Sequence, residues 1–332
     1  MNSHRDQAIK ARALWFEARD VANLREESLL EPASEEARVA TRWSAISRGT
    51  ERLVFEGRVP ATERQRMRAP FQQGDFPFPV KYGYCAVGVV EAGPPEWIGK
   101  EVFCLHPHQD RFVAPLAALR PIPNETPLRR APLAANMETA LNALWDSGAG
   151  PGDRIVIVGA GVLGLLIAYL AARLPGADVL VVDKEAARRE IARALGARFQ
   201  LAEDFQPEPL EADVVLHASA TAQGLALALA SGGLEATIVE TSWHGEGETP
   251  TPLGGAFHAK RLRLISSQVG QVSPSRRPRW PHARRLDKAL TLLADPLLDA
   301  LIIEEIEFEA MPRELPRLLA PGAPGLATLI RY

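Results

Sequence analysis

Apolar and polar residues alternate along the middle of the chain in a pattern typical of a parallel sheet flanked by helices. Short runs of apolar, often β-branched residues alternate with longer segments in which apolar residues recur at helical spacing. Strands are expected at 154–158, 178–182, 212–217, 235–240 and 262–266. Helices are expected at 137–147, 162–174, 186–195 and 222–229. Because strands and helices alternate, the pattern predicts a parallel sheet with helices on both faces.

The chain before about Pro132 has a different pattern. Short strand-like stretches are separated by prolines and glycines, which indicates an irregular β-rich domain with long loops. Examples of these stretches are 37–41, 87–91 and 101–105. Segment 60–79 is rich in proline and aromatic residues and is expected to form a loop or lid. Near the C-terminus, a helix is expected at about 284–293 and a last strand near 326–331.

Length and composition narrow the class of protein. A chain of 332 residues exceeds one ordinary hydrophobic core, so we expect two domains. The net charge of -3 offers no general attraction to nucleic acid or to anionic membranes. Only Cys85 and Cys104 occur, which excludes a disulfide framework and a four-cysteine zinc lobe and favours a cytoplasmic location. The N-terminal segment 1–10 is polar and lacks the apolar core of a signal peptide.

One segment is apolar enough to raise the question of a membrane span. Residues 155–174 are almost wholly apolar and about long enough to cross a bilayer. However, four β-branched residues open the segment, and Gly159, Gly161 and Gly164 follow. A buried strand, a tight turn and a buried helix explain this order better than one helix does. We therefore expect no membrane association.

The turn after the first strand of the expected parallel sheet carries a glycine motif. It reads Gly159-Ala160-Gly161-Val162-Leu163-Gly164, with a strand before it and a helix after it. In a dinucleotide-binding turn, the first glycine permits the tight bend and the second lets a pyrophosphate approach the backbone. The third allows close packing of helix and strand, and the helix N-terminus attracts the phosphates. The motif therefore predicts a dinucleotide site, although an empty glycine-rich turn is the alternative.

The acidic residue that this fingerprint requires is Asp183. It closes the next strand about 20 residues after the motif, where a carboxylate hydrogen-bonds the adenosine ribose hydroxyls. A carboxylate there repels a 2′-phosphate, so NAD is favoured over NADP. Lys184 follows directly and Arg188 is near, which weakens this preference. We expect NAD as the cofactor, with NADP less favoured.

The order of these features resembles the medium-chain dehydrogenase/reductase superfamily, the alcohol dehydrogenase-like group. A β-rich part is followed by Pro151-Gly152-Asp153 and then by the dinucleotide-binding strand. The resemblance covers essentially the whole chain and is carried by AISRGTE at 45–51, GYCAVGVVE at 83–91, TALNAL at 139–144 and KRLRLISS at 260–267. The SRGTE stretch is most similar to the branch that includes the bacteriochlorophyllide hydroxyethyl dehydrogenases.

The resemblance implies an α/β fold with two domains. A Rossmann doubly wound parallel sheet would occupy 135–266. A GroES-like β-rich catalytic domain would be discontinuous and comprise 1–134 and 267–332. The active site would lie in the cleft between the domains, and the protein would form homodimers or homotetramers.

The resemblance also assigns cofactor contacts outside the glycine motif. Arg48 matches a position that contacts the pyrophosphate, and guanidinium suits that role. Thr139 matches a residue that lies against the nicotinamide. Thr241 and Ser242 follow the fifth Rossmann strand and would lie near the nicotinamide ribose.

The zinc-ligand positions of the superfamily are all changed. Zinc-binding members have a cysteine at Ser47, a His-Glu pair at Tyr84-Cys85 and a third ligand at about Ala135. A catalytic zinc needs three protein ligands and an open position, so we expect no zinc and no other metal.

A different metal site is the alternative. Cys104, His106 and His108 alternate along a strand-like run, which would place them on one strand face, with Cys85 near. Their short spacing and the His-Pro-His sequence disfavour a tetrahedral site.

Without zinc, hydrogen-bond donors must stabilise the substrate oxygen during hydride transfer. Losing one such donor typically costs about 2.7–4 kcal/mol of transition-state stabilisation. Ser47, Thr50 and Tyr84 offer hydroxyl groups, His106 could shuttle a proton, and Glu51 could orient one of these or act as a base. The alternatives are that Ser47 or Thr50 only caps a helix and that Tyr84 only packs.

The clearest charge cluster is segment 276–285, which contains five arginines and Trp280. It would bind an anionic group of a small-molecule substrate, or it would form a solvated turn or subunit contact. Phe71, Phe76 and Phe78 could line the substrate pocket or pack at an interface.

Three functions remain open from the sequence. The first is an NAD(H)-dependent oxidoreductase that acts on CH-OH donors without zinc. The second is an NAD(P)H-dependent enone or quinone reductase, which Asp183 disfavours. The third is a dinucleotide-binding or redox-sensing protein without catalysis, which the loss of the zinc ligands suggests.

Overall fold

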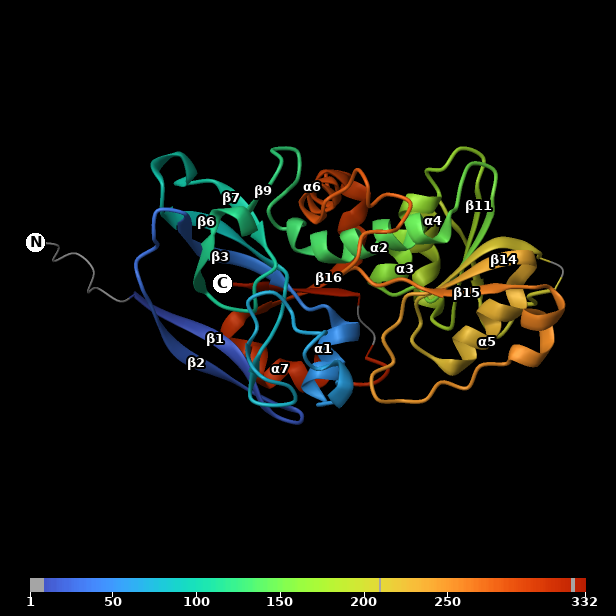
Figure 1. The fold of residues 1–332 in the computed structure, drawn as a ribbon, viewed down its shortest axis with the longest axis horizontal. Coiled ribbons are helices and arrows are strands. Elements are labelled where there is room, and N and C mark those ends of the chain that lie inside the picture. The colour runs from blue at the N-terminus through green and yellow to red at the C-terminus, as the bar shows by residue number, and fades with distance from the viewer. Residues whose placement is uncertain (1–8, 209, 324–325) are drawn as a thin grey trace, which may run out of the picture. The chain divides into compact units, whose positions relative to one another are not determined.

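The computed structural model describes residues 9–208, 210–323 and 326–332, so the first residues of the polar N-terminal segment lie outside it. The chain forms two compact units (Figure 1). Unit 1 takes the chain up to Ala135 and adds Leu290–Asp295 and Ile302–Tyr332. Unit 2 comprises Asn136–Ala289 and Pro296–Leu301. Residues 267–289, which the resemblance assigned to the β-rich domain, group with unit 2.

Unit 2 contains a six-stranded parallel sheet in the order β12-β11-β10-β13-β14-β15. Its strands are β10 (Arg154–Val158), β11 (Asp178–Asp183), β12 (Arg198–Leu201), β13 (Ala212–His217), β14 (Gly232–Glu240) and β15 (Arg263–Ser266). The strand order reverses between β10 and β13. In such sheets, ligands bind outside the carboxyl ends of the strands at this reversal.

The strand order determines which face of the sheet the helices of unit 2 cover. They are α2 (Ala134–Ser147), which begins in unit 1, α3 (Val162–Ala171), α4 (Arg189–Ala194), α5 (Ala222–Ser231) and α6 (His282–Leu292), which ends in unit 1. The chain moves from β10 to β11 in one direction along the sheet and from β13 to β14 in the other. Right-handed crossovers therefore place α3 and α5 on opposite faces, as Figure 1 shows. Both helices are almost entirely apolar because each covers the buried sheet.

Unit 1 contains an antiparallel sheet and a larger mixed sheet, both built mainly from the first part of the chain. One has the order β2-β1-β5-β4, and the other has β16-β17-β3-β6-β7-β9 with β8 beside β3. The strands are β1 (Ile9–Ala18), β2 (Val21–Leu29), β3 (Glu36–Ala45), β4 (Gln73–Gly74), β5 (Val80–Lys81), β6 (Ala86–Ala92), β7 (Glu101–Cys104), β8 (Arg111–Pro115), β9 (Arg120–Pro121), β16 (Ile302–Glu307) and β17 (Ala327–Arg331). The helices are α1 (Arg48–Phe55) and α7 (Met311–Leu318).

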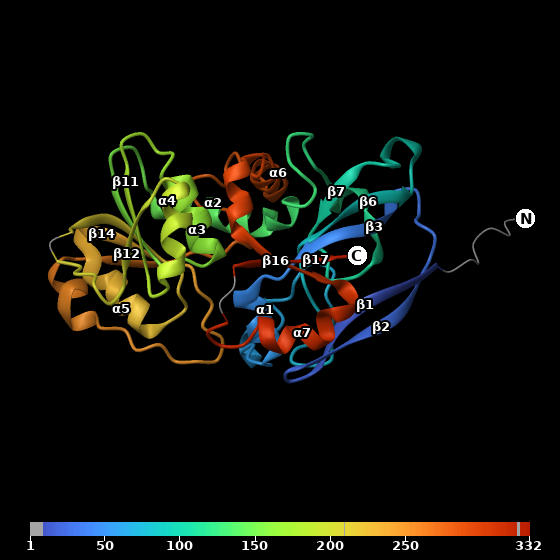
Figure 2. The same ribbon diagram turned by 180° about the vertical axis from the view of Figure 1, so that it is seen from behind.

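The C-terminal strands complete the larger sheet of unit 1. Strand β17 pairs with β3 antiparallel and with β16 parallel. Figure 2 shows β17, in red, beside β3, in blue. Segments from both ends of the sequence therefore share one sheet, which makes unit 1 discontinuous.

The sequence pattern and the structure agree closely in the parallel sheet and differ in detail elsewhere. The strand expected at 212–217 is β13 with identical bounds. The helix expected at 186–195 starts as a 3-10 turn at Ala186–Arg188 before α4. The apolar segment 155–174 is β10, a turn and α3, and no helix in the described residues is long and apolar enough to cross a membrane.

Candidate functional site

The glycine turn between β10 and α3 depends on close backbone packing. Gly159 has φ +110°, and a side chain there would meet the backbone nitrogen of Ser219 at 2.7 Å. Gly164 lies against the same turn, because an added Cβ would come within 1.8 Å of the Gly159 carbonyl oxygen. These contacts confirm that both positions require glycine, and they hold the helix N-terminus at the carboxyl end of β10.

The exposed part of this turn is suited to a phosphate group. Gly161 is exposed, and no atom lies within 4 Å of where its Cβ would be. Helix α3 begins at Val162, so the amides of Val162, Leu163 and Gly164 have no carbonyl partner within the helix. Amides in this position and the positive end of the helix dipole favour an anion.

Asp183 connects the end of β11 to the glycine turn. One carboxylate oxygen accepts the amide of Ala160 at 2.5 Å, and the other accepts the amide of Glu185 at 2.8 Å. The side chain is partly exposed, and a carboxylate retains further lone pairs for ribose hydroxyls. Lys184 is exposed and contacts Glu185 at 3.8 Å. The turn and Asp183 therefore fit the adenosine and diphosphate portions of a dinucleotide.

Polar residues also follow β13 and β14 at the same sheet edge. Thr241 donates to the carbonyl of His217 at 2.6 Å, and Ser242 accepts the amide of Ala220 at 3.1 Å. The predicted residues Thr241 and Ser242 thus join the ends of two neighbouring strands. His217 and Glu240, which we did not predict, lie beside them with a side-chain contact of 2.6 Å.

Unit 1 contains a second polar group, built around helix α1. The fully buried Glu51 accepts the backbone amide of Ser47 at 2.7 Å and contacts Nε2 of His108 at 3.1 Å. Nδ1 of His108 contacts the hydroxyl of Ser44 at 2.8 Å, and Ser44 contacts the hydroxyl of Tyr332 at 2.9 Å. We call Glu51, His108, Ser44 and Tyr332 the buried relay. A neutral imidazole satisfies it, because Nε2–H donates to Glu51 while Nδ1 accepts from Ser44.

Tyr84 lies beside this relay and is partly exposed. Burial is the main cause that raises its pKa, Cys85 and Glu51 add to the shift, and hydrogen bonds with Ser47 and Thr50 oppose it. The phenol is therefore protonated near neutral pH and can donate a hydrogen bond. Ser47 is the N-cap of α1 but makes no side-chain cap bond. The structure thus brings together Ser47, Thr50, Glu51 and Tyr84, four of the five predicted catalytic residues.

Comparisons with known proteins found relatives among dehydrogenase and dehydrogenase-like proteins. No protein-family model matches the chain. It is 28% identical over 210 residues to an uncharacterized zinc-type alcohol dehydrogenase-like protein of Haemophilus influenzae, covering 60% of this chain but only 57% of that protein. It is 25% identical to D-guloside 3-dehydrogenase of Escherichia coli over 293 residues, covering 80% of this chain and 83% of that protein.

A solved structure supports the same fold over both units. The NADP-bound structure of a putative zinc-binding dehydrogenase from Sinorhizobium meliloti matches with a TM-score of 0.78 at 19% identity, covering 98% of this chain and 100% of the other. The chain is thus similar in sequence to dehydrogenase and dehydrogenase-like proteins, and it shares the fold of the solved dehydrogenase structure. The expected combination of a Rossmann domain and a GroES-like domain is confirmed.

At the positions where the resemblance expects zinc ligands, this chain has other side chains. Ser47 offers only a hydroxyl, which bonds with Tyr84, and Ala135 has no side-chain donor. Cys85 is fully buried, and burial raises the pKa of its thiol well above the ordinary value. Zinc binds the thiolate, which this environment disfavours.

The assignment of a proton shuttle to His106 is not supported by its environment. Its ring stacks on Phe112 with centroids 4.0 Å apart and packs near Phe71, and Nδ1–H donates to the Pro107 carbonyl at 3.0 Å. Burial lowers its pKa from 6.5 to about 3. His108, two residues later, is the histidine that contacts Glu51.

The alternative metal site of Cys104, His106 and His108 assumed that the three residues alternate along one strand, and this assumption is wrong. Strand β7 ends at Cys104, so the two histidines do not alternate along it. Burial raises the pKa of Cys104 to about 12. Within the described residues, the side chains that cluster closely enough for a metal are instead His217, Glu240 and His244.

The structure places two further predicted cofactor contacts, Arg48 and Thr139. Arg48 donates to the carbonyl of Ala320 at 3.0 Å and to that of Ala323, both beyond α7. Thr139 lies on α2 and is partly exposed.

In the arginine-rich segment 276–285, Arg285 is buried and pairs with Glu138 at 2.9 Å, so it cannot serve an exposed anion-binding rim. Arg276, an exposed member, lies over Trp145.

Sequence reasoning missed residues that tertiary structure brings together. His108 was interpreted as a metal ligand or as a polar residue of a cleft or the surface, and Ser44 and Tyr332 lie far apart in sequence. His217 and Glu240 carried a usable signal, because each ends a buried parallel strand, and such ends form ligand sites.

Proposed function

We propose that this protein is an NAD(H)-dependent dehydrogenase of alcohol substrates. Its relatives and structural neighbours are named dehydrogenases of CH-OH donors, and this supports an oxidoreductase of that class. The observation that carries the proposal is the glycine turn with Asp183 bonded to the amide of Ala160. The carboxylate at the end of β11 supports NAD over NADP, because a 2′-phosphate would be repelled there.

We also propose that the reaction proceeds without zinc at the superfamily's ligand positions. The bound coenzyme supplies or accepts the hydride. The protonated phenol of Tyr84 donates a hydrogen bond to the substrate oxygen, so it stabilises the negative charge that develops when a carbonyl is reduced. In alcohol oxidation, the phenol keeps its own proton and its hydrogen bond to the oxygen, and the proton of the alcohol hydroxyl is released to water.

The neighbours of Tyr84 have positioning roles in this proposal. The hydroxyls of Ser47 and Thr50 bond with the phenol and orient it. Glu51 fixes the N-terminus of α1 through the amide of Ser47, and His108 holds Glu51 in place. The buried relay thus keeps the residues around Tyr84 in one arrangement, which preorganises the site.

The substrate is proposed to be a small polyol or sugar derivative. A relative acts on a guloside, which makes this class the natural first choice. An anionic group on the substrate would suit the exposed Arg276, Arg277 and Arg279. We also propose a cytoplasmic homodimer or homotetramer.

A direct spectrophotometric activity screen tests the proposal. Purified protein is incubated with NAD or NADP and a panel of secondary alcohols, polyols and glycosides, and NADH or NADPH formation is followed by absorbance. We expect turnover with at least one polyol or glycoside and higher kcat/KM with NAD. Enones and quinones are screened in parallel with NADH and NADPH, and turnover of these compounds only, with NADPH, would contradict the proposal.

A further inference from the structure

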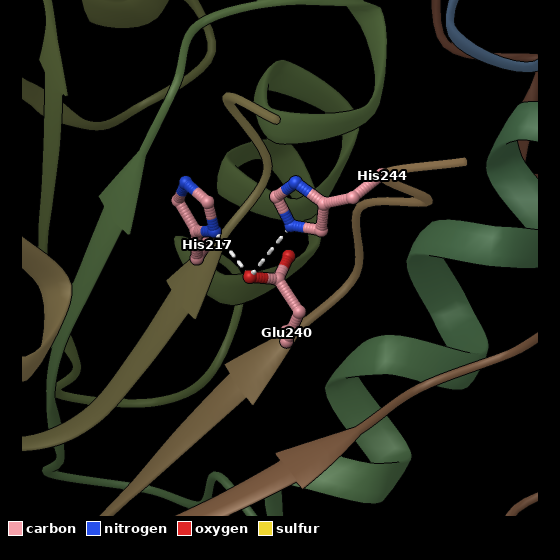
Figure 3. A group of neighbouring side chains, drawn as sticks. All are labelled: His217, Glu240 and His244. Atoms are coloured by element: carbon pink, nitrogen blue, oxygen red, sulfur yellow. Dashed lines mark hydrogen bonds and ion pairs between the residues drawn. The ribbon is translucent and has the colours of Figure 1, made fainter. Parts of the chain in front are cut away.

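Three side chains at the carboxyl ends of β13 and β14 point toward a common centre (Figure 3). His217 ends β13, Glu240 ends β14, and His244 lies in the loop that follows. One carboxylate oxygen of Glu240 lies 2.6 Å from Nδ1 of His217 and 3.4 Å from Nε2 of His244. One ligand atom from each residue lies within 4.8 Å of the others.

His244 is the least satisfied member of this group. Its Nε2 is buried and has no hydrogen bond of ordinary geometry in the described residues, although Glu240 is 3.4 Å away. A buried ring nitrogen without a hydrogen bond costs free energy unless another ligand satisfies it. This nitrogen faces the Glu240 carboxylate, so the two atoms are placed to bind the same cation.

Hydrogen bonds to neighbouring residues fix the side chains of His217 and Glu240. Nε2 of His217 contacts the hydroxyl of Ser219 at 2.7 Å, and Ser219 contacts Thr221 at 3.0 Å. The second oxygen of Glu240 accepts the amide of Ser242 at 2.7 Å. If Nδ1 of His217 binds a cation, Nε2–H can donate to Ser219, which is the outer contact that metal-bound histidines usually make.

The donor set selects a class of metal. Two imidazoles and one carboxylate form a common three-ligand set for zinc, with the fourth position left open. Metal–ligand bonds of about 2.0–2.1 Å in a tetrahedron place neighbouring ligand atoms roughly 3.3 Å apart. The separation between His244 and Glu240 already has this value, at 3.4 Å. The contact between His217 and Glu240 must open by less than about 1 Å.

We propose that His217, Glu240 and His244 bind one divalent transition-metal ion of the zinc class in unit 2. The site is distinct from the superfamily's zinc-ligand positions, which belong to Ser47, Cys85 and Ala135 of unit 1. It lies at the sheet edge that carries the glycine turn. The two strand ends make the site rigid, while the partly exposed Glu240 and His244 leave an approach for the ion.

The test is a metal titration of the untagged full-length protein after chelator treatment and dialysis. Co²⁺ is the probe, because its visible absorption bands report tetrahedral coordination, and Zn²⁺ is then added to displace it. We expect one Co²⁺ per chain, displaced by one Zn²⁺. Glu240→Gln and His244→Gln should each weaken binding at least about 100-fold, because each leaves two ligands. His258→Gln, which removes an exposed histidine of the same unit, should bind Co²⁺ as the wild type does.

Two results would overturn the proposal. One is the absence of stoichiometric Co²⁺ and Zn²⁺ binding in the wild type. The other is unchanged binding in both Glu240→Gln and His244→Gln. Circular dichroism melting curves confirm that the variants are folded, and the partly exposed His244 is the substitution least able to disturb the core. NADH titration of the same variants separates loss of the metal from loss of coenzyme binding.

Discussion

At the scale of single residues, environment decides which polar groups can take part in chemistry. Tyr84 and His106 were both candidates from the sequence, and both carry a polar atom on a ring. Tyr84 is partly exposed beside two hydroxyls, whereas His106 is stacked between aromatic rings with its pKa lowered to about 3. Residue type suggested both roles, but burial and partners depend on tertiary packing, which local sequence does not reveal.

Replacing Tyr84 by phenylalanine tests its proposed role. Tyr84→Phe should lower kcat about 100- to 1000-fold, which corresponds to about 2.7–4 kcal/mol of lost transition-state stabilisation. The KM for NAD should change little, since the substitution leaves unit 2 intact. Steady-state kinetics measure both values. Tyr82→Phe is the matched control, because this buried neighbour should leave kcat within a few-fold of wild type; a kcat loss equal in both variants would contradict the assignment.

The buried His106 should make stability depend on pH. Its pKa is lowered from 6.5 to about 3 by burial, so between these values the unfolded chain binds a proton that the folded chain does not. The free energy of unfolding therefore falls as pH decreases below about 6.5. His106→Leu should reduce the loss between pH 7 and pH 5 by about 2 kcal/mol. Urea unfolding at both pH values measures this difference.

The control for this prediction is an exposed histidine. His282→Gln should leave the loss between pH 7 and pH 5 as it is in the wild type, since this residue is exposed in the folded chain. An equal pH dependence of unfolding in the wild type and His106→Leu would show that His106 is not kept neutral by the fold.

At the scale of elements, the turn between β10 and α3 shows what a local motif can and cannot specify. The motif predicted the roles of Gly159 and Gly164, and the structure confirms the close approaches. The elements of the parallel sheet were predictable because each buried strand has a continuous apolar run. The short strand β12 was missed, since four residues with two polar members give little pattern.

A pair of alanine substitutions separates packing from ligand binding in this turn. Gly164→Ala should lower the free energy of unfolding by roughly 1–3 kcal/mol, because its Cβ would meet the Gly159 carbonyl at 1.8 Å. Gly161→Ala should change the free energy of unfolding by less than about 1 kcal/mol, because nothing lies within 4 Å of the added Cβ. The same substitution should weaken NADH binding, because the methyl group would stand where the pyrophosphate approaches the backbone. Urea unfolding and NADH titration measure the two effects. Equal destabilisation by both substitutions would contradict the reading of the turn.

At the scale of the whole molecule, the order of strands within each sheet explains why part of the candidate site escaped prediction. The superfamily resemblance predicted a Rossmann and a GroES-like domain, and both are present. Yet Ser44 meets Tyr332 only because β17 returns to pair with β3. Likewise, His217 and Glu240 meet because β13 and β14 are neighbours in the sheet. Contacts of this kind depend on topology and register, which periodicity along the chain does not encode.

The central claim concerns the coenzyme, and calorimetric titration of the full-length protein with NADH and NADPH tests it most directly. The wild type should bind NADH at least about tenfold more tightly than NADPH, because Asp183 accepts ribose hydroxyls and repels a phosphate. Asp183→Asn, which keeps a side-chain oxygen for the amide of Ala160, should reduce this preference while the melting temperature stays near that of the wild type. Failure to bind either coenzyme, or tighter binding of NADPH by the wild type, would contradict the account.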